Sequence, residues 1–420
     1  MNRIKILPLF LTLSFFCALN AIAQNSDEFI YDNYFTPERA RIELVFGGDA
    51  SEQHLFLAGL YREPTWSGPR KTLVEPFNYG EYRYEVYSKD GKLLMKKGFN
   101  TLFQEWRTTP EAKRTKRSFT GSYLIPFPKD SIKVIFYQRS WVDGNYSSLL
   151  TIDISPEDKA INGEIQNSHK TIPIRVNGDS WNKVDLLFIA EGYTIDQMNK
   201  FLNDVNKFTG YLIETEPYKS RHEDLNIWAL CIPSEESGTD IPQNNIWKNT
   251  ALSSNFYTFS LDRYLTAPDH SLIAAAAWAS PYDIIYVIVN TEKYGGGGIY
   301  NYYGLSMSDH KNESEVFVHE LGHAFAGLAD EYYSSAVTYE EFYNLSLEPW
   351  EPNITTKVDF ASKWIDLMGK DSVGLYEGGG YTAKGIFRPR EDCKMKSNVS
   401  QTFCPVCERA INKMINFYTK

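Results

Sequence analysis

The sequence predicts two domains, an all-β sandwich over residues 24–165 and an α/β (α+β) domain over residues 166–420. The chain has 420 residues, which is more than a single domain of ordinary size contains. Residues 24–165 consist of short alternating polar and apolar runs separated by turn signals. From Lys183 onward, apolar runs of strand length alternate with segments of helical periodicity, which is the pattern of a sheet covered by helices.

Residues 1–23 have the pattern of a secretory signal peptide. Arg3 and Lys5 precede the largely apolar stretch 6–19, which is too short to span a bilayer comfortably, and Ala21-Ile22-Ala23 forms a small-x-small cleavage site. We therefore expect a mature chain that begins at Gln24 and is secreted or periplasmic. No other segment is long and apolar enough to predict a membrane span.

The charge balance argues against two classes of partner. The formal net charge is −10, and the sequence has no basic patch that would indicate a nucleic-acid partner. It also has no cluster of Lys and Arg that would indicate binding to anionic lipid. An acidic surface of this kind mainly favours solubility.

The sandwich is predicted from its strand-like runs and turns. The turn signals include Lys89-Asp90-Gly91 and Asp143-Gly144-Asn145, and they separate runs that alternate with a period of two, as in a small sandwich. The domain contains one histidine, His54, and no catalytic constellation, so we interpret it as a packing or substrate-presenting module rather than a catalytic one. The predicted strands are 41–46, 54–61, 82–88, 93–99, 132–138 and 147–154.

The second domain is predicted to alternate strands with helices. A largely apolar run over 184–190 fits a buried strand, and Pro268 interrupts the second predicted helix. The elements in order are a strand at 184–190, a helix at 194–218, a strand at 225–232, a helix at 261–278 and a strand at 282–290.

Four consecutive glycines, Gly295–Gly298, precede the short apolar run 299–307. No Gly-Lys-Ser/Thr follows them, so they do not form a phosphate-binding loop. One interpretation is a flexible loop that leads to an exposed sheet edge, where an extended peptide could add its own backbone hydrogen bonds. The other is an ordinary glycine loop.

Residues 319–323 read His-Glu-Leu-Gly-His. Positions i and i+4 share one face of a helix, so His319 and His323 can reach one zinc ion, and Glu320 can contact a water beside it as general base. This geometry suits metal-assisted hydrolysis of a peptide bond. The alternative, two surface histidines on a polar helix, is disfavoured because apolar residues flank them: Val316, Phe317, Val318, Ala324 and Phe325.

The bounds of this helix indicate where a third ligand lies. Asn312 and Glu315 have the spacing of a capping box, and Gly327 fits the end of the helix. A carboxylate three or four residues later can return to the metal, with Asp330 preferred and Glu331 in reserve. His310 is the nearest remaining candidate if neither binds. Three protein ligands leave the open position that is typical of catalytic zinc.

Four cysteines remain after signal cleavage: Cys231, Cys393, Cys404 and Cys407. The spacing of Cys404 and Cys407 suits a structural zinc half-site or a thioredoxin-like motif, but no second pair and no βαβ unit supports either. We therefore favour a disulfide from Cys393 to Cys404 or Cys407, and expect Cys231 to be buried and free. A final helix is predicted to begin near Pro405.

Residues 184–407 resemble the bacterial immunoglobulin A peptidase family of metzincin-like zinc endopeptidases, and the preceding segment is similar to the N-terminal β-domain of that family. The matching segments are Phe-Ile-Ala-Glu-Gly-Tyr at 188–193, Asn-Ile-Trp-Ala at 226–229, Pro-Ser-Glu-Glu-Ser-Gly-Thr-Asp at 233–240, His-Glu-Leu-Gly-His-Ala-Phe-Ala-Gly-Leu-Ala-Asp-Glu-Tyr at 319–332, Cys-Lys-Met at 393–395 and Phe-Cys-Pro-Val-Cys at 403–407.

The resemblance implies a zincin/metzincin-like peptidase domain that uses Zn²⁺ and acts on a protein or peptide. It implies that His319 and His323 are zinc ligands, that Glu320 is the general base, and that Met395 is the Met-turn methionine beneath the site. Gly327 follows His323 by four residues, where the metzincin pattern has three. The third ligand is therefore either Asp330 or Glu331.

Two other functions are compatible with the same motifs. One is a catalytically silent binding protein that keeps the zincin shell, and the other is a zinc hydrolase that acts on cell-wall peptides or glycopeptides. The intact Glu320 argues against the silent protein, because a protein without catalysis has no chemical need for that carboxylate. Digestion of a protein substrate and, separately, of murein would distinguish the peptidase from the cell-wall hydrolase.

Overall fold

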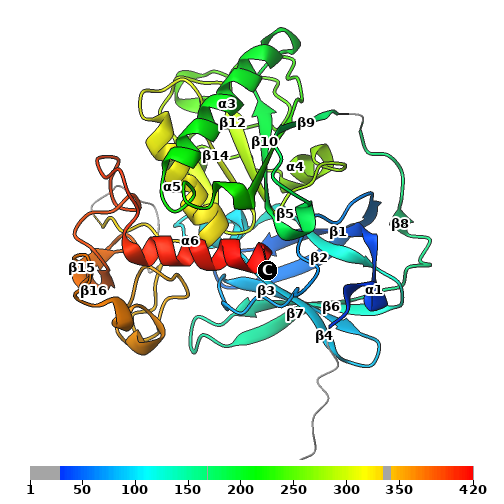
Figure 1. Ribbon diagram of the computed structural model, residues 1–420, viewed down its shortest axis with the longest axis horizontal. Coiled ribbons are helices and arrows are strands. Elements are labelled where there is room, and N and C mark those ends of the chain that lie inside the picture. Colours follow the sequence, from blue (N-terminus) through cyan, green and yellow to red (C-terminus); the bar gives the residue numbers. More distant parts are fainter. Residues whose placement is uncertain (1–28, 168, 334–341, 420) are drawn as a thin grey trace, which may run out of the picture.

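The structure, a computed structural model, describes residues 29–167, 169–333 and 342–419. The signal peptide predicted over residues 1–23 lies outside these described residues. In the part of the chain that the structure describes, no helix is long and apolar enough to cross a membrane. A strand-rich N-terminal domain packs against a mixed α/β domain (Figure 1), as the sequence predicts.

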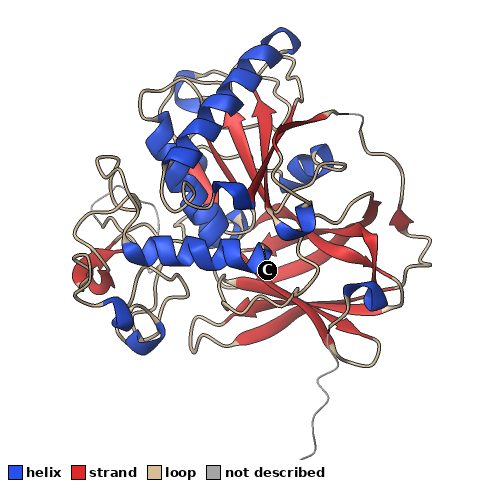
Figure 2. Ribbon diagram, in the orientation of Figure 1, coloured by secondary structure: helices blue, strands red, loops and turns tan. Residues whose placement is uncertain are grey.

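The N-terminal domain is a sandwich of two four-stranded sheets (Figure 2). All strand pairs are antiparallel except the short pair β2–β8. The first sheet has the order β5 (Arg117–Pro128), β1 (Phe35–Gly48), β2 (Gln53–Glu63) and β8 (Ile161–Asn162). The second has the order β4 (Leu93–Phe99), β3 (Tyr82–Ser88), β6 (Ile132–Arg139) and β7 (Tyr146–Ile154).

All six strands predicted for this domain are present, and β3 and β4 have the predicted bounds. The strand β5 was not predicted, because it contains Gly121 and Pro126, two residues that disfavour strands. The short helices α1 (Tyr31–Tyr34) and α2 (Leu102–Arg107) were not predicted either. Thr101 begins α2, because its hydroxyl accepts a hydrogen bond from the backbone N–H of Gln104.

The α/β domain is built on a six-stranded sheet whose inner strands are parallel and whose two outer strands are antiparallel. Every residue of β10, β12 and β14 is buried, which explains their continuous apolar character. The order is β13 (Gly296–Ile299), β14 (Tyr303–Met307), β12 (Ile284–Val289), β10 (Val184–Glu191), β11 (Leu225–Leu230) and β9 (Thr171–Arg175).

Helices flank this sheet. The helices α3 (Met198–Glu214) and α5 (Glu313–Ala326) cover one face, and the short α4 (His270–Ala276) lies on the side nearer the sandwich (Figure 1). The final helix α6 (Pro405–Tyr418) begins where predicted and crosses between α5 and the sandwich. A small hairpin, β15 (Tyr376–Gly379) with β16 (Thr382–Arg388), lies beyond its N-terminal end.

The helix predicted over 261–278 is wrong over its first half. Only His270–Ala276 is helical, and Asp269 begins it by accepting a hydrogen bond from the backbone N–H of Ser271. Pro268 lacks an N–H and restricts the residue before it, so a helix cannot run through this point. The preceding segment instead lies beside the sheet, where Tyr264 forms an isolated bridge to Gly296.

A buried arginine joins the two domains. Arg39 of β1 forms a 2.7 Å ion pair with Glu63 of β2. Its guanidinium also donates to the carbonyl oxygens of Ala277, Trp278 and Ser280, at 2.9–3.0 Å, where α4 ends. Because a buried charge is tolerated only when it is paired and hydrogen-bonded, this network fixes α4 against the sandwich.

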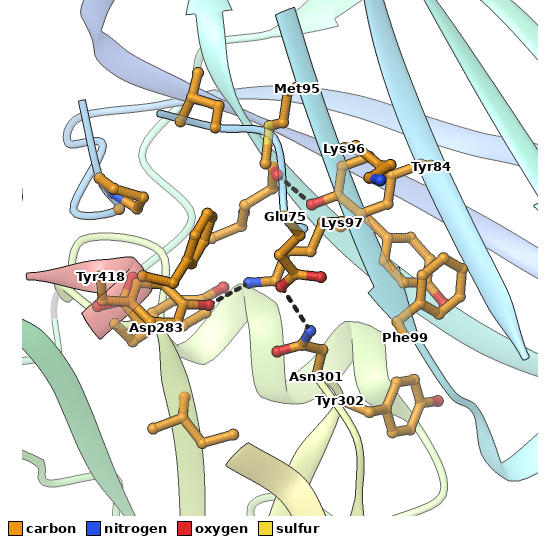
Figure 3. Close-up of a pocket in the computed structure, with 18 of the residues that line it drawn as sticks. Glu75, Tyr84, Met95, Lys96, Lys97, Phe99, Asp283, Asn301, Tyr302 and Tyr418 are labelled. Atoms are coloured by element: carbon orange, nitrogen blue, oxygen red, sulfur yellow. Dashed lines mark hydrogen bonds between the residues drawn. The ribbon is translucent and has the colours of Figure 1, made fainter. Parts of the chain in front are cut away.

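A small cavity of about 70 Å³ lies at the same interface (Figure 3). Lys97 of β4 donates to the Tyr418 hydroxyl at 3.0 Å, which ties the end of α6 to the sandwich. Glu75 accepts from the backbone N–H of Gly98 at 3.0 Å and from the Asn301 amide at 3.5 Å. Lys97 and Asn301 therefore hydrogen-bond across the interface between the two domains.

Candidate active site

The helix α5 is held against the sheet by aromatic packing. Phe317 contacts the rings of Phe188, Phe208 and Tyr286, with ring centroids 4.8–5.7 Å apart. His319, two positions later, points to the other side of the helix from Phe317, and Glu320 lies at the margin between the two sides. They line a cleft with a volume of about 390 Å³.

The bounds of α5 match the prediction, but its N-terminal cap does not. The side chain of Asn312 makes no capping hydrogen bond in the structure. Its backbone N–H instead donates to Nδ1 of His310 at 3.1 Å. His310 is not among the residues that line the cleft, so the structure does not bring this reserve candidate to the site.

Gly327 ends α5 in the left-handed conformation, with φ of 62°, as predicted. Its N–H donates to the carbonyl of His323 at 3.1 Å, and the N–H of Leu328 donates to that of Gly322 at 3.2 Å. A Cβ at position 327 would lie 2.9 Å from the Trp350 ring, so both backbone angle and space favour glycine. The chain therefore reverses and returns to the cleft.

Three side-chain atoms converge at the floor of the cleft. Nε2 of His319 lies 3.0 Å from Nε2 of His323 and 3.0 Å from Oδ1 of Asp330, and His323 Nε2 lies 3.3 Å from the same Oδ1. Nitrogen and oxygen ligands about 2.0–2.1 Å from a tetrahedral zinc ion lie about 3.3–3.4 Å apart. The donor set and its spacing thus fit one zinc ion.

Both histidines are oriented by backbone carbonyl groups. Nδ1 of His319 donates to the carbonyl oxygen of Lys394 at 2.9 Å, and Nδ1 of His323 donates to that of Leu328 at 2.5 Å. A carbonyl oxygen only accepts, so each Nδ1 carries the proton and each Nε2 lone pair points into the site. The hydroxyl of Tyr381 donates to Oδ2 of Asp330, which leaves Oδ1 directed at the histidines.

The segment that carries Asp330 is fixed on every side. The Asn353 amide accepts from the N–H of Ala329 at 2.7 Å and donates to its carbonyl at 2.9 Å. The N–H of Gly380 donates to the carbonyl of Asp330 at 2.8 Å, and that of Glu331 donates to the carbonyl of Met395 at 2.8 Å. These bonds hold the Asp330 carboxylate in place before any metal binds.

Met395 lies beneath the histidine-bearing turn of α5. It is fully buried, and a Cβ at Gly322 would lie 2.9 Å from its sulfur. Gly322, between the two histidines in sequence, therefore lets the methionine approach the helix closely. This position agrees with the hydrophobic floor implied by the family resemblance.

Electrostatic coupling within the cluster favours cation binding. Burial alone would lower the pKa of His323, but the Asp330 carboxylate outweighs it and raises that pKa to about 9. The carboxylate therefore attracts a positive charge to Nε2 of His323, and a metal ion competes with the proton for this nitrogen. Burial raises the pKa of Glu320, while the two histidines oppose this shift.

Comparison with known protein families assigns most of the chain. The profile of the family described as IgA Peptidase M64 matches residues 172–373 and 369–415, which is more than half of the sequence. The chain belongs to the IgA Peptidase M64 family. Its sandwich matches the profile described as Peptidase M64 N-terminus over residues 30–147. No curated protein matched the chain. Membership of this family makes the protein a peptidase, whose substrates are peptides.

The glycine run of this M64 peptidase is an edge strand rather than a loop. Gly296 and Gly298 of β13 face α5, where a Cβ on Gly296 would lie 3.1 Å from Oε1 of Glu320. A Cβ on Gly298 would lie 2.2 Å from the Glu320 backbone oxygen. The glycines are needed because the helix and the strand approach too closely for any side chain.

The sandwich of the M64 peptidase contributes to the cleft wall. Asn100 and Glu105 line the cleft, and Glu105 accepts a hydrogen bond from the Tyr264 hydroxyl. On the opposite segment, Arg263 donates to the Tyr332 hydroxyl at 3.3 Å, and the Tyr332 ring stacks 6.5 Å from that of His319. No sequence signal identified Asn100, Glu105, Arg263 or Tyr264, because each reaches the cleft through contacts distant in sequence. Tyr332 lies in the segment 319–332 that carries the family resemblance.

Glu331 does not face the histidines of the M64 peptidase. Its Oε1 lies 3.3 Å from the sulfur of Cys407, so the carboxylate that the structure brings to the two histidines is that of Asp330. The disulfide predicted from Cys393 is not formed, since Cys393, Cys404 and Cys407 are all free thiols and all buried. Cys231 is free as expected, but half-buried rather than buried.

Proposed function

We propose that this M64 peptidase is a secreted zinc endopeptidase, with His319, His323 and Asp330 as zinc ligands. The observation that carries this proposal is the convergence of two Nε2 atoms and one carboxylate oxygen within 3.0–3.3 Å. Three protein ligands in an open cleft leave a position for water and substrate. The predicted signal peptide supports export to the periplasm or beyond.

Glu320 is the proposed general base. A zinc ion in such a site supplies Lewis acidity and makes a water molecule easier to deprotonate. The Glu320 carboxylate lines the same cleft as the two histidines, and it accepts the proton of the attacking water. It then returns that proton to the nitrogen of the leaving amine, so one carboxylate acts first as base and then as acid.

The edge strand β13 is the proposed binding site for an extended substrate. In an antiparallel pair, residues whose backbone groups bond to the partner strand alternate with residues whose backbone groups point away from it. Gly297 of β13 pairs with Leu305 of β14, so the N–H and C=O groups of Gly296 and Gly298 point away from β14. Tyr264 bridges to Gly296, and this covers one end of the edge that the sequence analysis expected to be exposed. We propose that the substrate backbone pairs at Gly298, directly beside Glu320.

A digestion experiment tests the function and separates the alternatives. Purified mature protein is incubated with unfolded protein substrates and, separately, with murein fragments, before and after treatment with a zinc chelator. The proposal expects internal cleavage of the protein, loss of cleavage with chelator and recovery on adding zinc. Cleavage of murein alone would favour the cell-wall hydrolase, and no cleavage by zinc-loaded protein would favour the silent binding protein.

A further inference from the structure

A second cluster of metal-binding side chains lies beneath the Met-turn. Cys393, Cys404, Cys407 and Glu331 are all buried, and one ligand atom from each lies within 4.8 Å of the others. The sulfur atoms of Cys393 and Cys407 are 3.8 Å apart, and the Cys407 sulfur is 3.3 Å from Oε1 of Glu331.

These distances fit ligands around one ion. Sulfur atoms bound to tetrahedral zinc at about 2.3 Å lie about 3.8 Å from each other. A disulfide would bring two sulfur atoms to about 2.05 Å, and three thiols cannot all be satisfied by one such bond. A metal ion, in contrast to a disulfide, can bind all three cysteine sulfur atoms at once.

The carboxylate of Glu331 supplies independent evidence that this cluster binds a cation. Its Oε1 accepts from the Asn353 amide at 3.0 Å, whereas its Oε2 is buried and has no hydrogen-bond partner among the described residues. An unpaired buried carboxylate oxygen is costly. A cation between Glu331 and the three sulfur atoms would remove that cost.

We propose that Cys393, Cys404, Cys407 and Glu331 bind a second zinc ion in a closed, four-coordinate site. Thiolate ligands select zinc over harder cations, and the two-residue spacing of Cys404 and Cys407 is typical of zinc half-sites. Each thiol releases its proton to solvent on binding. The N-terminus of α6 stabilises the thiolates, because Cys404 precedes its first residue and Cys407 is its third.

The closed site has a structural role, because it leaves no position for water or substrate. It fixes the two segments that position the active site. Cys393 immediately precedes Lys394, whose carbonyl orients His319, and Glu331 immediately follows Asp330. An ion that binds Cys393 and Glu331 together would lock these segments from below. This inference does not depend on the peptidase mechanism, since the second ion does not touch the cleft.

The test counts zinc and identifies its ligands in the full mature protein. The double variant His319→Ala/His323→Ala removes the proposed catalytic ligands and leaves all four residues of the second cluster intact. Elemental analysis is expected to find two zinc ions per wild-type chain and one per chain of the double variant. X-ray absorption of that remaining zinc is expected to show sulfur neighbours at about 2.3 Å.

Two variants complete the design. Cys407→Ser is expected to lose the sulfur-bound zinc and to lower the melting temperature, whereas Cys231→Ser, a half-buried cysteine outside the cluster, is expected to keep both ions. The inference is overturned if the double histidine variant holds no zinc, or if its zinc has only nitrogen and oxygen neighbours. Peptide mapping without reduction that links Cys393 to Cys404 or Cys407 would overturn it equally.

Discussion

The backbone N–H of Glu331 donates a 2.8 Å hydrogen bond to the carbonyl oxygen of Met395. This bond joins the segment that carries Asp330 to the segment whose Lys394 carbonyl orients His319. Two of the three proposed zinc ligands are therefore positioned by one pair of neighbouring chain segments. Perturbing this contact should disturb the metal site without any change to the ligands.

The first prediction concerns the general base. Glu320→Gln keeps the shape of the side chain but removes the carboxylate that accepts a proton, so the peptidase rate should fall by at least about 10²- to 10⁴-fold. Zinc content should not change, because Glu320 is not a proposed ligand. Glu315→Gln, on the same helix but outside the cleft, is the matched control. Undiminished cleavage by zinc-loaded Glu320→Gln would exclude this mechanism.

The second prediction separates Asp330 from its neighbour Glu331. Asp330→Asn removes the charge that faces both histidines, and should strip the zinc bound by nitrogen and oxygen and abolish activity. Glu331→Gln should instead weaken the sulfur-bound zinc while the histidine site remains occupied. Elemental analysis combined with X-ray absorption distinguishes the two. The reverse pattern would exchange the roles assigned to these carboxylates.

The third prediction concerns Tyr381, whose hydroxyl donates to Oδ2 of Asp330. Loss of such a supporting bond typically weakens metal affinity or activity by about 10- to 100-fold. Tyr381→Phe should therefore bind zinc more weakly in a competition titration with a chelator, while its fold is preserved. Tyr376→Phe removes a hydroxyl that donates to the carbonyl of Ser372 at 3.3 Å and lies outside the cleft lining, and should bind zinc like wild type. Equal affinities for the two variants would contradict the role of Tyr381.

The fourth prediction concerns the contact between β13 and α5. Gly298→Ala would place a Cβ 2.2 Å from the Glu320 backbone oxygen and 3.0 Å from Cβ of His323, so strand and helix must separate. Overpacking of this kind typically costs about 1–3 kcal/mol, and activity should fall further than stability because Glu320 moves. Gly163→Ala, which meets nothing within 4 Å, is the control for thermal denaturation and activity. A fully active Gly298→Ala would show that the close contact is dispensable.

The fifth prediction concerns His270 at the domain interface. Burial lowers the pKa of His270 to about 3, and its Nδ1 accepts a 3.1 Å hydrogen bond from the backbone N–H of Ser122. In the unfolded chain the pKa is about 6.5. Between these values the unfolded state binds more protons, so the free energy of unfolding falls as pH drops from about 6.5, by up to about 1.4 kcal/mol per pH unit.

His270→Asn tests this dependence, because asparagine keeps an acceptor but does not titrate. The variant should be less stable than wild type at pH 7, and its stability should decline less steeply between pH 6.5 and 4.5. Denaturant titrations at several pH values measure both quantities, with the exposed His54 replaced by Asn as control. Parallel slopes for His270→Asn and wild type would refute the assignment.

The sequence by itself determined the elements whose pattern is local. The bounds of β3 and β4, the left-handed end of α5 at Gly327 and the start of α6 at Pro405 follow from alternation, glycine conformation and proline preference. The motif at 319–323 and the return of Asp330 follow from helical periodicity and one turn. Each of these features depends on residues within a few positions of each other, so a single sequence contains the information.

Only the tertiary structure decided the contacts that complete the site. Tyr381, Asn353 and the Lys394 carbonyl reach the ligands from segments far along the chain. The same holds for Glu331, which local spacing left as a second choice for the catalytic metal and which folding directs to the cysteines. Spacing along the chain limits which side chains can meet, but packing of distant segments decides which of them do, because burial and hydrogen bonding are satisfied over the whole fold at once.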